Sequence, residues 1–196
     1  MQGFSFINIK MKPIKQIGTD IKVYADKLSR EGFRQIFDRI DQLNVKKGVD
    51  TLGLDKFINQ CAYLAAGSGV ISGSGGIVTM LVGLPVDVVN LITQQFRVTM
   101  AIMYYNKGSY KVSFEEFMSL VAASLKVEAG VAVTKNIMEA VAEKLVMKLG
   151  ARAAQRLIPI VGAVIGGTAN YIFIKRMSES VKELHTITRP IAIPVK

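Results

Sequence analysis

Residues 85–107 read PVDVVNLITQQFRVTMAIMYYNK, and this stretch decides the fold. Proline is tolerated in the first turn of a helix, where its missing N–H would have no intrahelical partner. No other proline or glycine occurs before Gly108, and Arg97 is the only charged residue between Asp87 and Lys107. We therefore predict one long helix that begins at Pro85, runs to about Tyr105 and stops near Gly108. A helix that is apolar on most faces belongs in the core of a bundle.

Other segments carry helical signals of the same kind. Apolar residues recur at helical spacing from Ile21 to Leu43, where Gly32 marks a possible break into two helices. Ser113-Phe114-Glu115-Glu116 matches a capping box, in which Ser113 and Glu116 each satisfy a free N–H at the start of a helix. Further helices are predicted at 54–66, from 113 to about 126, at 127–149 and 152–158, and from Pro159 to about Leu184, with a loop at 45–49.

No strand pattern of comparable length is present, so the predicted fold class is all-α. We expect a compact bundle of about six to eight helices around a long apolar central pair, formed by the Pro85 and Pro159 helices in antiparallel arrangement. The predicted organisation is an N-terminal arm at 1–15, a single helical domain at 16–185 and an extended C-terminal tail at 186–196.

The charge and the apolar residues are separated along the chain. The net charge is +10, from 25 Lys and Arg against 15 Asp and Glu, although half of the residues are apolar. This composition excludes an intrinsically disordered chain. One cysteine, Cys61, and one histidine, His185, exclude a disulfide scaffold and a tetrahedral Cys/His zinc site. The central residues 57–106 have no net charge, so the basic excess lies on the two flanks.

Two stretches contain no charged residue, Phe57 to Val86 and Leu157 to Ile174. Each approaches the length of about 20 apolar residues that spans a bilayer, but glycines interrupt both. Buried helices are the simpler interpretation, and insertion into a membrane or formation of a pore is the alternative. Basic flanks beside apolar segments also suit a protein that rests on an anionic membrane surface. Residues 1–15 lack the apolar core of a secretory signal, which predicts a cytoplasmic protein, peripheral to the inner membrane.

A polar stripe on the Pro85 helix supplies the candidate ligand-binding residues. Asp87, Asn90, Gln94 and Arg97 share one helix face. The simpler interpretation is a solvent-facing stripe, and the alternative is a buried polar seam. In a seam, Asp87 and Arg97 lie about 15 Å apart along the axis and need other partners, such as Asn170, a lipid head group or water. We assign these five residues as ligand-binding, and predict no catalytic residue, metal site or cofactor.

Two groups of motifs resemble the EcsC-like family. The first resembles the family's central helix: Gly83-Leu84-Pro85-Val86-Asp87, Gln95-Phe96-Arg97 and Tyr105-Asn106-Lys107-Gly108. The second resembles its C-terminal helix: Leu157-Ile158-Pro159-Ile160-Val161-Gly162-Ala163, Gly166-Gly167 and Asn170-Tyr171. The resemblance covers roughly residues 54–180 and departs at Asn106-Lys107, where the family more usually has a glycine directly after the tyrosine. It implies a bacterial helical protein associated with membranes, and it implies no activity or catalytic residue.

These observations favour a non-enzymatic helical protein that acts at the cytoplasmic membrane surface. It would bind lipid, another apolar ligand or a membrane protein between the Pro85 and Pro159 helices. Two other classes stay open: a soluble protein–protein interaction module with a basic face for an acidic partner, and a membrane-inserting or pore-forming protein. Nucleic acid is not an expected partner, because Lys and Arg alternate with acidic residues and no recognition motif is present.

Overall fold

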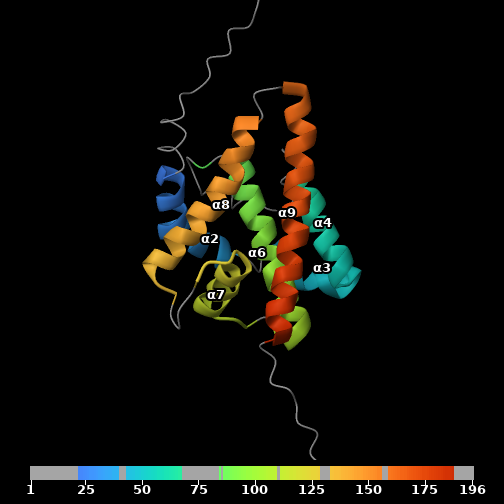
Figure 1. Ribbon diagram of the computed structural model, residues 1–196. Coiled ribbons are helices and arrows are strands. Elements are labelled where there is room, and N and C mark those ends of the chain that lie inside the picture. Colours follow the sequence, from blue (N-terminus) through green and yellow to red (C-terminus); the bar gives the residue numbers. More distant parts are fainter. Residues whose placement is uncertain are drawn as a thin grey trace, which may run out of the picture.

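A computed structural model describes residues 22–39, 43–67, 84, 86–109, 111–128, 133–155 and 159–187. Within these ranges, the side chains of residues 30, 148–155, 159–166 and 185–187 are not described. Every regular element in these ranges is helical, which confirms the all-α class and the compact bundle (Figure 1). The elements are residues 22–27, the π-helical turn η1 (Leu28–Gly32), α2 (Phe33–Phe37), α3 (Val45–Leu52), α4 (Leu54–Ala66), α6 (Val86–Lys107), α7 (Phe114–Ser124), α8 (Lys135–Gln155) and α9 (Pro159–Ile187).

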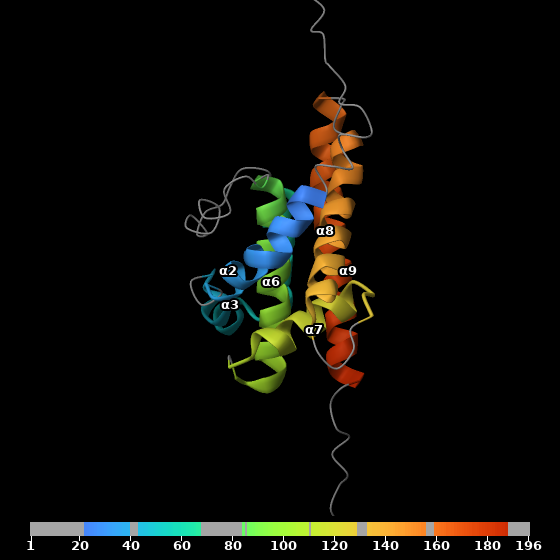
Figure 2. The same cartoon turned by 90° about the vertical axis from the view of Figure 1, so that its left-hand side faces the viewer.

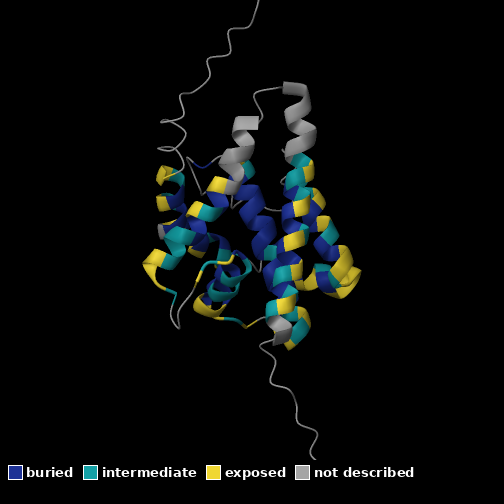
Figure 3. Cartoon of the chain, in the orientation of Figure 1, coloured by how far each residue is buried: buried dark blue, intermediate teal, exposed yellow. Residues whose placement is uncertain are grey.

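Helix α6 is the centre of the bundle. Every residue from Val88 to Met103 is buried except Arg97, which is half-buried (Figure 3). The other helices surround it, with α4 and α9 on one side and η1, α2, α7 and α8 on the other (Figures 1 and 2). The Phe96 ring lies 5.8 Å from Phe33 and 4.8 Å from Phe117, measured between ring centroids. A mostly apolar helix therefore forms the core of the fold, as the sequence predicts.

Helices α6 and α9 run in the same direction, so the predicted antiparallel pair is wrong (Figure 1). Asn90 and Asn170 both reach the last turn of α4, and further along Thr99 Oγ1 lies 3.8 Å from Met177 Sδ. The arrangement is parallel because α8 carries the chain back to the end of the bundle where α6 began. Antiparallel to both, α4 packs against α6 and α9. The long apolar central pair stays a prediction, because side chains 159–166 of α9 lie outside the described set.

Residues 45–49 form part of α3, and the loop predicted there is wrong. Val45 and Val49, one helical turn apart, are both buried against the core. Gly48, which suggested a loop, is instead needed for packing, because a Cβ at this position would overlap the Phe57 ring. Gly32 likewise makes no break, and the backbone stays helical through η1 into α2.

The helix predicted at 127–149 begins later and ends later. Helix α8 starts at Lys135, where Thr134 Oγ1 accepts a hydrogen bond from Ile137 N at 3.4 Å. It continues through Gly150 to Gln155, so no separate helix begins at Arg152. A glycine inside a helix costs only about 1 kcal/mol, which neighbouring contacts readily offset.

The ends of α6 and α7 agree with the local signals. Helix α6 stops at Lys107, and Gly108 adopts the left-handed backbone conformation with φ +65°. Ser113 Oγ accepts a hydrogen bond from Glu116 N at 3.1 Å, as a capping residue should. The reciprocal half of the capping box is not formed, because the Glu116 carboxylate pairs with Lys107 instead.

None of the helices in the described ranges combines the length and hydropathy needed to cross a bilayer. The charge-free stretch Phe57 to Val86 is not one helix, since α4 ends at Ala66 and residues 68–83 lie outside the description. The arm at 1–15 and residues 188–196 of the tail also lie outside it, while residues 186–187 belong to α9.

Candidate functional site

The predicted polar stripe is a buried seam between α6 and α4. Asn90 and Gln94 are buried, and Asp87 and Arg97 are half-buried, so the solvent-facing interpretation is wrong for the middle of the stripe. A ladder of hydrogen bonds joins three of them. Arg97 Nη1 donates to Gln94 Oε1 at 2.8 Å, and Gln94 Nε2 donates to Asn90 Oδ1 at 3.1 Å. Asp87 lies in the first turn of α6, where the helix dipole favours an anion.

The ladder ends on the C-terminus of α4. The last four carbonyls of a helix have no intrahelical partner, and burying them unpaired is costly. Asn90 Nδ2 donates to the Leu64 carbonyl at 2.9 Å. Asn170 Nδ2, from α9, donates to the Ala65 carbonyl at 3.0 Å. Two asparagines from different helices therefore cap one buried helix end.

Close contact with α9 completes this arrangement. A Cβ built on Gly167 would lie 2.9 Å from the Ala66 carbonyl oxygen, so only glycine fits without a shift. The seam thus brings together four of the five predicted site residues, Asn90, Gln94, Arg97 and Asn170, around α4. Their described contacts are made within the chain.

The outer end of the seam holds an arginine in an apolar setting. The Arg97 guanidinium carbon lies 5.0 Å from the centroid of the Phe57 ring, and its Nε is buried without a hydrogen-bond partner. Cys61 is fully buried nearby, and this burial raises the pKa of its thiol to about 11, while the Arg97 charge acts in the opposite direction. The seam therefore holds Cys61 as a neutral thiol at physiological pH, which makes it a poor nucleophile.

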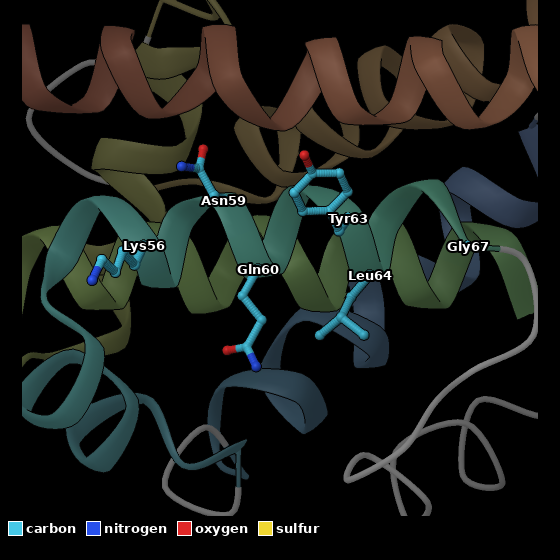
Figure 4. Close-up of a pocket in the computed structure, with 6 residues that line it drawn as sticks. All are labelled: Lys56, Asn59, Gln60, Tyr63, Leu64 and Gly67. Carbon is cyan, nitrogen blue, oxygen red and sulfur yellow. The ribbon is translucent and has the colours of Figure 1, made fainter.

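A hollow on the outer side of α4 was not anticipated from the sequence (Figure 4). Its volume is about 550 Å³, and its described lining is Lys56, Asn59, Gln60, Tyr63, Leu64 and Gly67. Asn59 and Tyr63 lie on the side of α4 that faces α9, and Gln60 and Leu64 point away from α9 (Figure 4). Tyr63 is 68% exposed, a large value for an aromatic side chain.

Contacts with α9 extend this hollow into a wider surface. The Tyr63 ring lies 5.0 Å from that of Tyr171, and Lys175 Nζ donates to Asn59 Oδ1 at 2.8 Å. We call Lys56, Asn59, Tyr63, Tyr171 and Lys175 the α4–α9 face. At its edge, Lys182 donates to Asp55 at 2.7 Å, and this hydrogen bond lowers the pKa of the Asp55 carboxyl.

A second hollow, the α7–α9 groove, lies on the other side of α9. It has a volume of about 690 Å³ between α9 and the turn that follows α7. Leu125, Phe173 and Met177 are its buried apolar residues, and Ile172 is partly exposed beside them. Its four charged residues are exposed: Lys126, Arg176, Glu179 and Glu183. Periodicity alone does not reveal this groove, because Lys126 and Arg176 come from distant parts of the chain.

The described side chains contain no group of three or more His, Cys, Asp or Glu placed to hold a metal ion. Comparison with known protein families, curated proteins and solved structures found no match for this chain.

Proposed function

We propose that the chain is a non-enzymatic helical protein that acts at the cytoplasmic membrane surface and docks on anionic lipid through the α4–α9 face. The observation that carries the proposal is Tyr63, an aromatic side chain that is 68% exposed beside Tyr171 and flanked by lysines. Tyrosine favours the interface between water and the acyl region, because its ring is apolar and its hydroxyl is polar.

Lysines around the tyrosines supply the attraction to an anionic surface. Lys56, Lys175 and Lys182 lie on or beside the α4–α9 face, and Lys182 pairs with Asp55. A lysine near an anionic bilayer contributes about 1 kcal/mol, and salt weakens this attraction. Two tyrosines and a local surplus of lysine together suit reversible, salt-sensitive docking.

This proposal moves the binding site away from the polar stripe. A ligand between the Pro85 and Pro159 helices would have to displace the end of α4, because Asn90 and Asn170 already bond its carbonyls. Breaking those bonds would leave buried carbonyls unpaired. The α4–α9 face requires no such rearrangement, since Lys56 and Tyr63 are exposed and Tyr171 and Lys175 are partly exposed beside them.

Vesicle flotation tests the proposal. We expect the wild-type chain to float with vesicles that contain phosphatidylglycerol at low salt, and less at high salt. Lys56→Glu should reduce the floating fraction several-fold, whereas Lys47→Glu, the same charge change at an exposed position on α3, should change it little. A wild-type chain that stays at the bottom of the gradient at low salt would contradict the proposal, as would equal losses in the two variants.

The two other classes predict different results. A soluble interaction module would use the same face for an acidic protein and would ignore vesicles. A membrane-inserting protein would resist extraction by carbonate, whereas the proposed docking is reversed by salt. Membership of the EcsC-like family stays a prediction from the motifs.

A further inference from the structure

The α7–α9 groove has the dimensions and the chemistry of a ligand site. Its volume of about 690 Å³ falls within the range of small-molecule pockets, which is roughly 300–1,000 Å³. The groove is apolar where Leu125, Phe173 and Met177 line it. Lys144, on α8, holds the turn after α7 in place, because its Nζ donates hydrogen bonds to the carbonyls of Leu125 at 3.0 Å and Lys126 at 2.7 Å. The wall of the groove is therefore held in place without help from a ligand.

Four charges surround this apolar floor, and none of them has a partner among the described residues. Lys126 and Arg176 are cationic, and Glu179 and Glu183 are anionic. No ion pair or hydrogen bond joins any of these side chains to another described residue, although Arg176 and Glu179 are three positions apart on α9. The groove thus presents charges of both signs that are available to a bound molecule.

The geometry points to a zwitterionic amphiphile as the ligand: a lipid with one aliphatic chain and a phosphoethanolamine head group. The aliphatic chain would lie on the apolar floor. The phosphate would face Arg176 and Lys126, because guanidinium and ammonium groups donate hydrogen bonds to phosphate oxygens. The ammonium would face Glu179, with Glu183 one turn further along the helix.

The spacing of the charges favours this head group over others. Arg176 and Glu179 are separated by about 4.5 Å along the helix axis. The phosphate and the ammonium of phosphoethanolamine are joined by two carbon atoms, so they span a similar distance. A purely anionic head group would leave both glutamates unpaired beside its negative charge, and an uncharged chain would use none of the four charges.

Titration calorimetry with the full chain tests this inference. The probes are short-chain lysophosphatidylethanolamine and lysophosphatidylglycerol, each below its critical micelle concentration. Because no membrane is present, the result is independent of docking through the α4–α9 face. We expect the wild-type chain to bind the ethanolamine lipid about tenfold more tightly, which one charge-assisted hydrogen bond can supply.

Two charge variants separate the roles of the groove residues. Glu179→Gln should remove the preference for the ethanolamine lipid, whereas Glu143→Gln, at an exposed position on α8, should keep it. Arg176→Gln should weaken binding of both lipids about tenfold, whereas Lys47→Gln should not.

A third variant tests the apolar floor. Ala169→Trp places a large side chain in the groove and should abolish binding, whereas Leu52→Trp on α3 should leave it unchanged. Thermal unfolding of each variant establishes that it is folded. The inference is overturned if the wild-type chain binds neither lipid, if it binds both equally, or if Glu143→Gln removes the preference as Glu179→Gln does.

Discussion

At the scale of single residues, the two capping asparagines connect three helices. Each supplies one side-chain N–H to a carbonyl at the end of α4, one from α6 and one from α9. The sequence singled out both residues as candidate ligand-binding residues, and that role stays a prediction. It did not indicate their partners, because the acceptors are backbone atoms of a third helix that carry no signature in the sequence.

Removing the Asn170 amide tests its capping role. Asn170→Ala leaves the Ala65 carbonyl buried without this donor, and we expect it to lower the free energy of unfolding by about 1–3 kcal/mol in urea denaturation. Asn136→Ala, at an exposed position on α8, serves as the control and should stay within about 0.5 kcal/mol of wild type. Equal stability of the two variants would refute the role.

Two adjacent glutamines on α6 should respond in opposite ways to the same substitution. Both side-chain polar atoms of Gln95 are buried without a hydrogen-bond partner, whereas Gln94 both donates and accepts. Gln95→Met removes an unsatisfied amide at similar volume and should raise the free energy of unfolding by about 1–3 kcal/mol. Gln94→Met breaks the ladder and should lower it by a similar amount. Destabilisation of similar size in both variants would show that Gln95 has a partner.

The buried Cys61 thiol makes the free energy of unfolding depend on pH in the alkaline range. The folded-state pKa of its thiol is about 11, against 9.0 when unperturbed. Between these values the unfolded chain loses the proton while the folded chain keeps it, so the free energy of unfolding falls as pH rises. The slope approaches 1.4 kcal/mol per pH unit. In Cys61→Ala, the free energy of unfolding measured by urea denaturation should fall less steeply between pH 9 and 11 than in the wild type. If the two proteins give parallel plots of this free energy against pH, the raised thiol pKa is contradicted.

At the scale of elements, the sequence predicted helix ends correctly where residues at or near those ends determine them. The run of apolar residues and Gly108 predicted α6, and Ser113 predicted the start of α7, because these residues act on their own helix. The predictions failed where a distant contact decides. Gly48 accommodates the Phe57 ring inside a helix, so it does not mark a loop. The parallel course of α6 and α9 depends on the whole path through α7 and α8.

The close approach of α4 and α9 depends on Gly167. Gly167→Ala would ordinarily favour the helix by up to about 1 kcal/mol. Here the added Cβ would lie 2.9 Å from the Ala66 carbonyl oxygen, so the helices must separate. We expect a net loss of about 1–3 kcal/mol in thermal or urea unfolding. A Cβ added at Gly67 would lie 3.7 Å from its nearest neighbouring atom, which is an ordinary contact. The control Gly67→Ala should therefore lower the free energy of unfolding by less. A more stable Gly167→Ala variant would show that the contact is loose.

At the scale of the whole molecule, net charge is a poor guide to the proposed docking surface. The described side chains include sixteen Lys and Arg against thirteen Asp and Glu, so the described bundle is nearly balanced. Most of the surplus of +10 comes from residues whose side chains lie outside the description. The α4–α9 face is basic because of its own lysines, so the net charge of the chain does not locate the surface proposed to dock.

The chain contains no tryptophan, so a single introduced indole reports on its own position alone. Tyr63→Trp places it on the α4–α9 face, and Tyr105→Trp places it at an exposed position near the end of α6, where Tyr105 is 62% exposed. With vesicles containing phosphatidylglycerol, we predict a blue shift of the emission and quenching by brominated lipid for Tyr63→Trp only. Unchanged emission from Tyr63→Trp, or equal quenching of both variants, would contradict docking through this face.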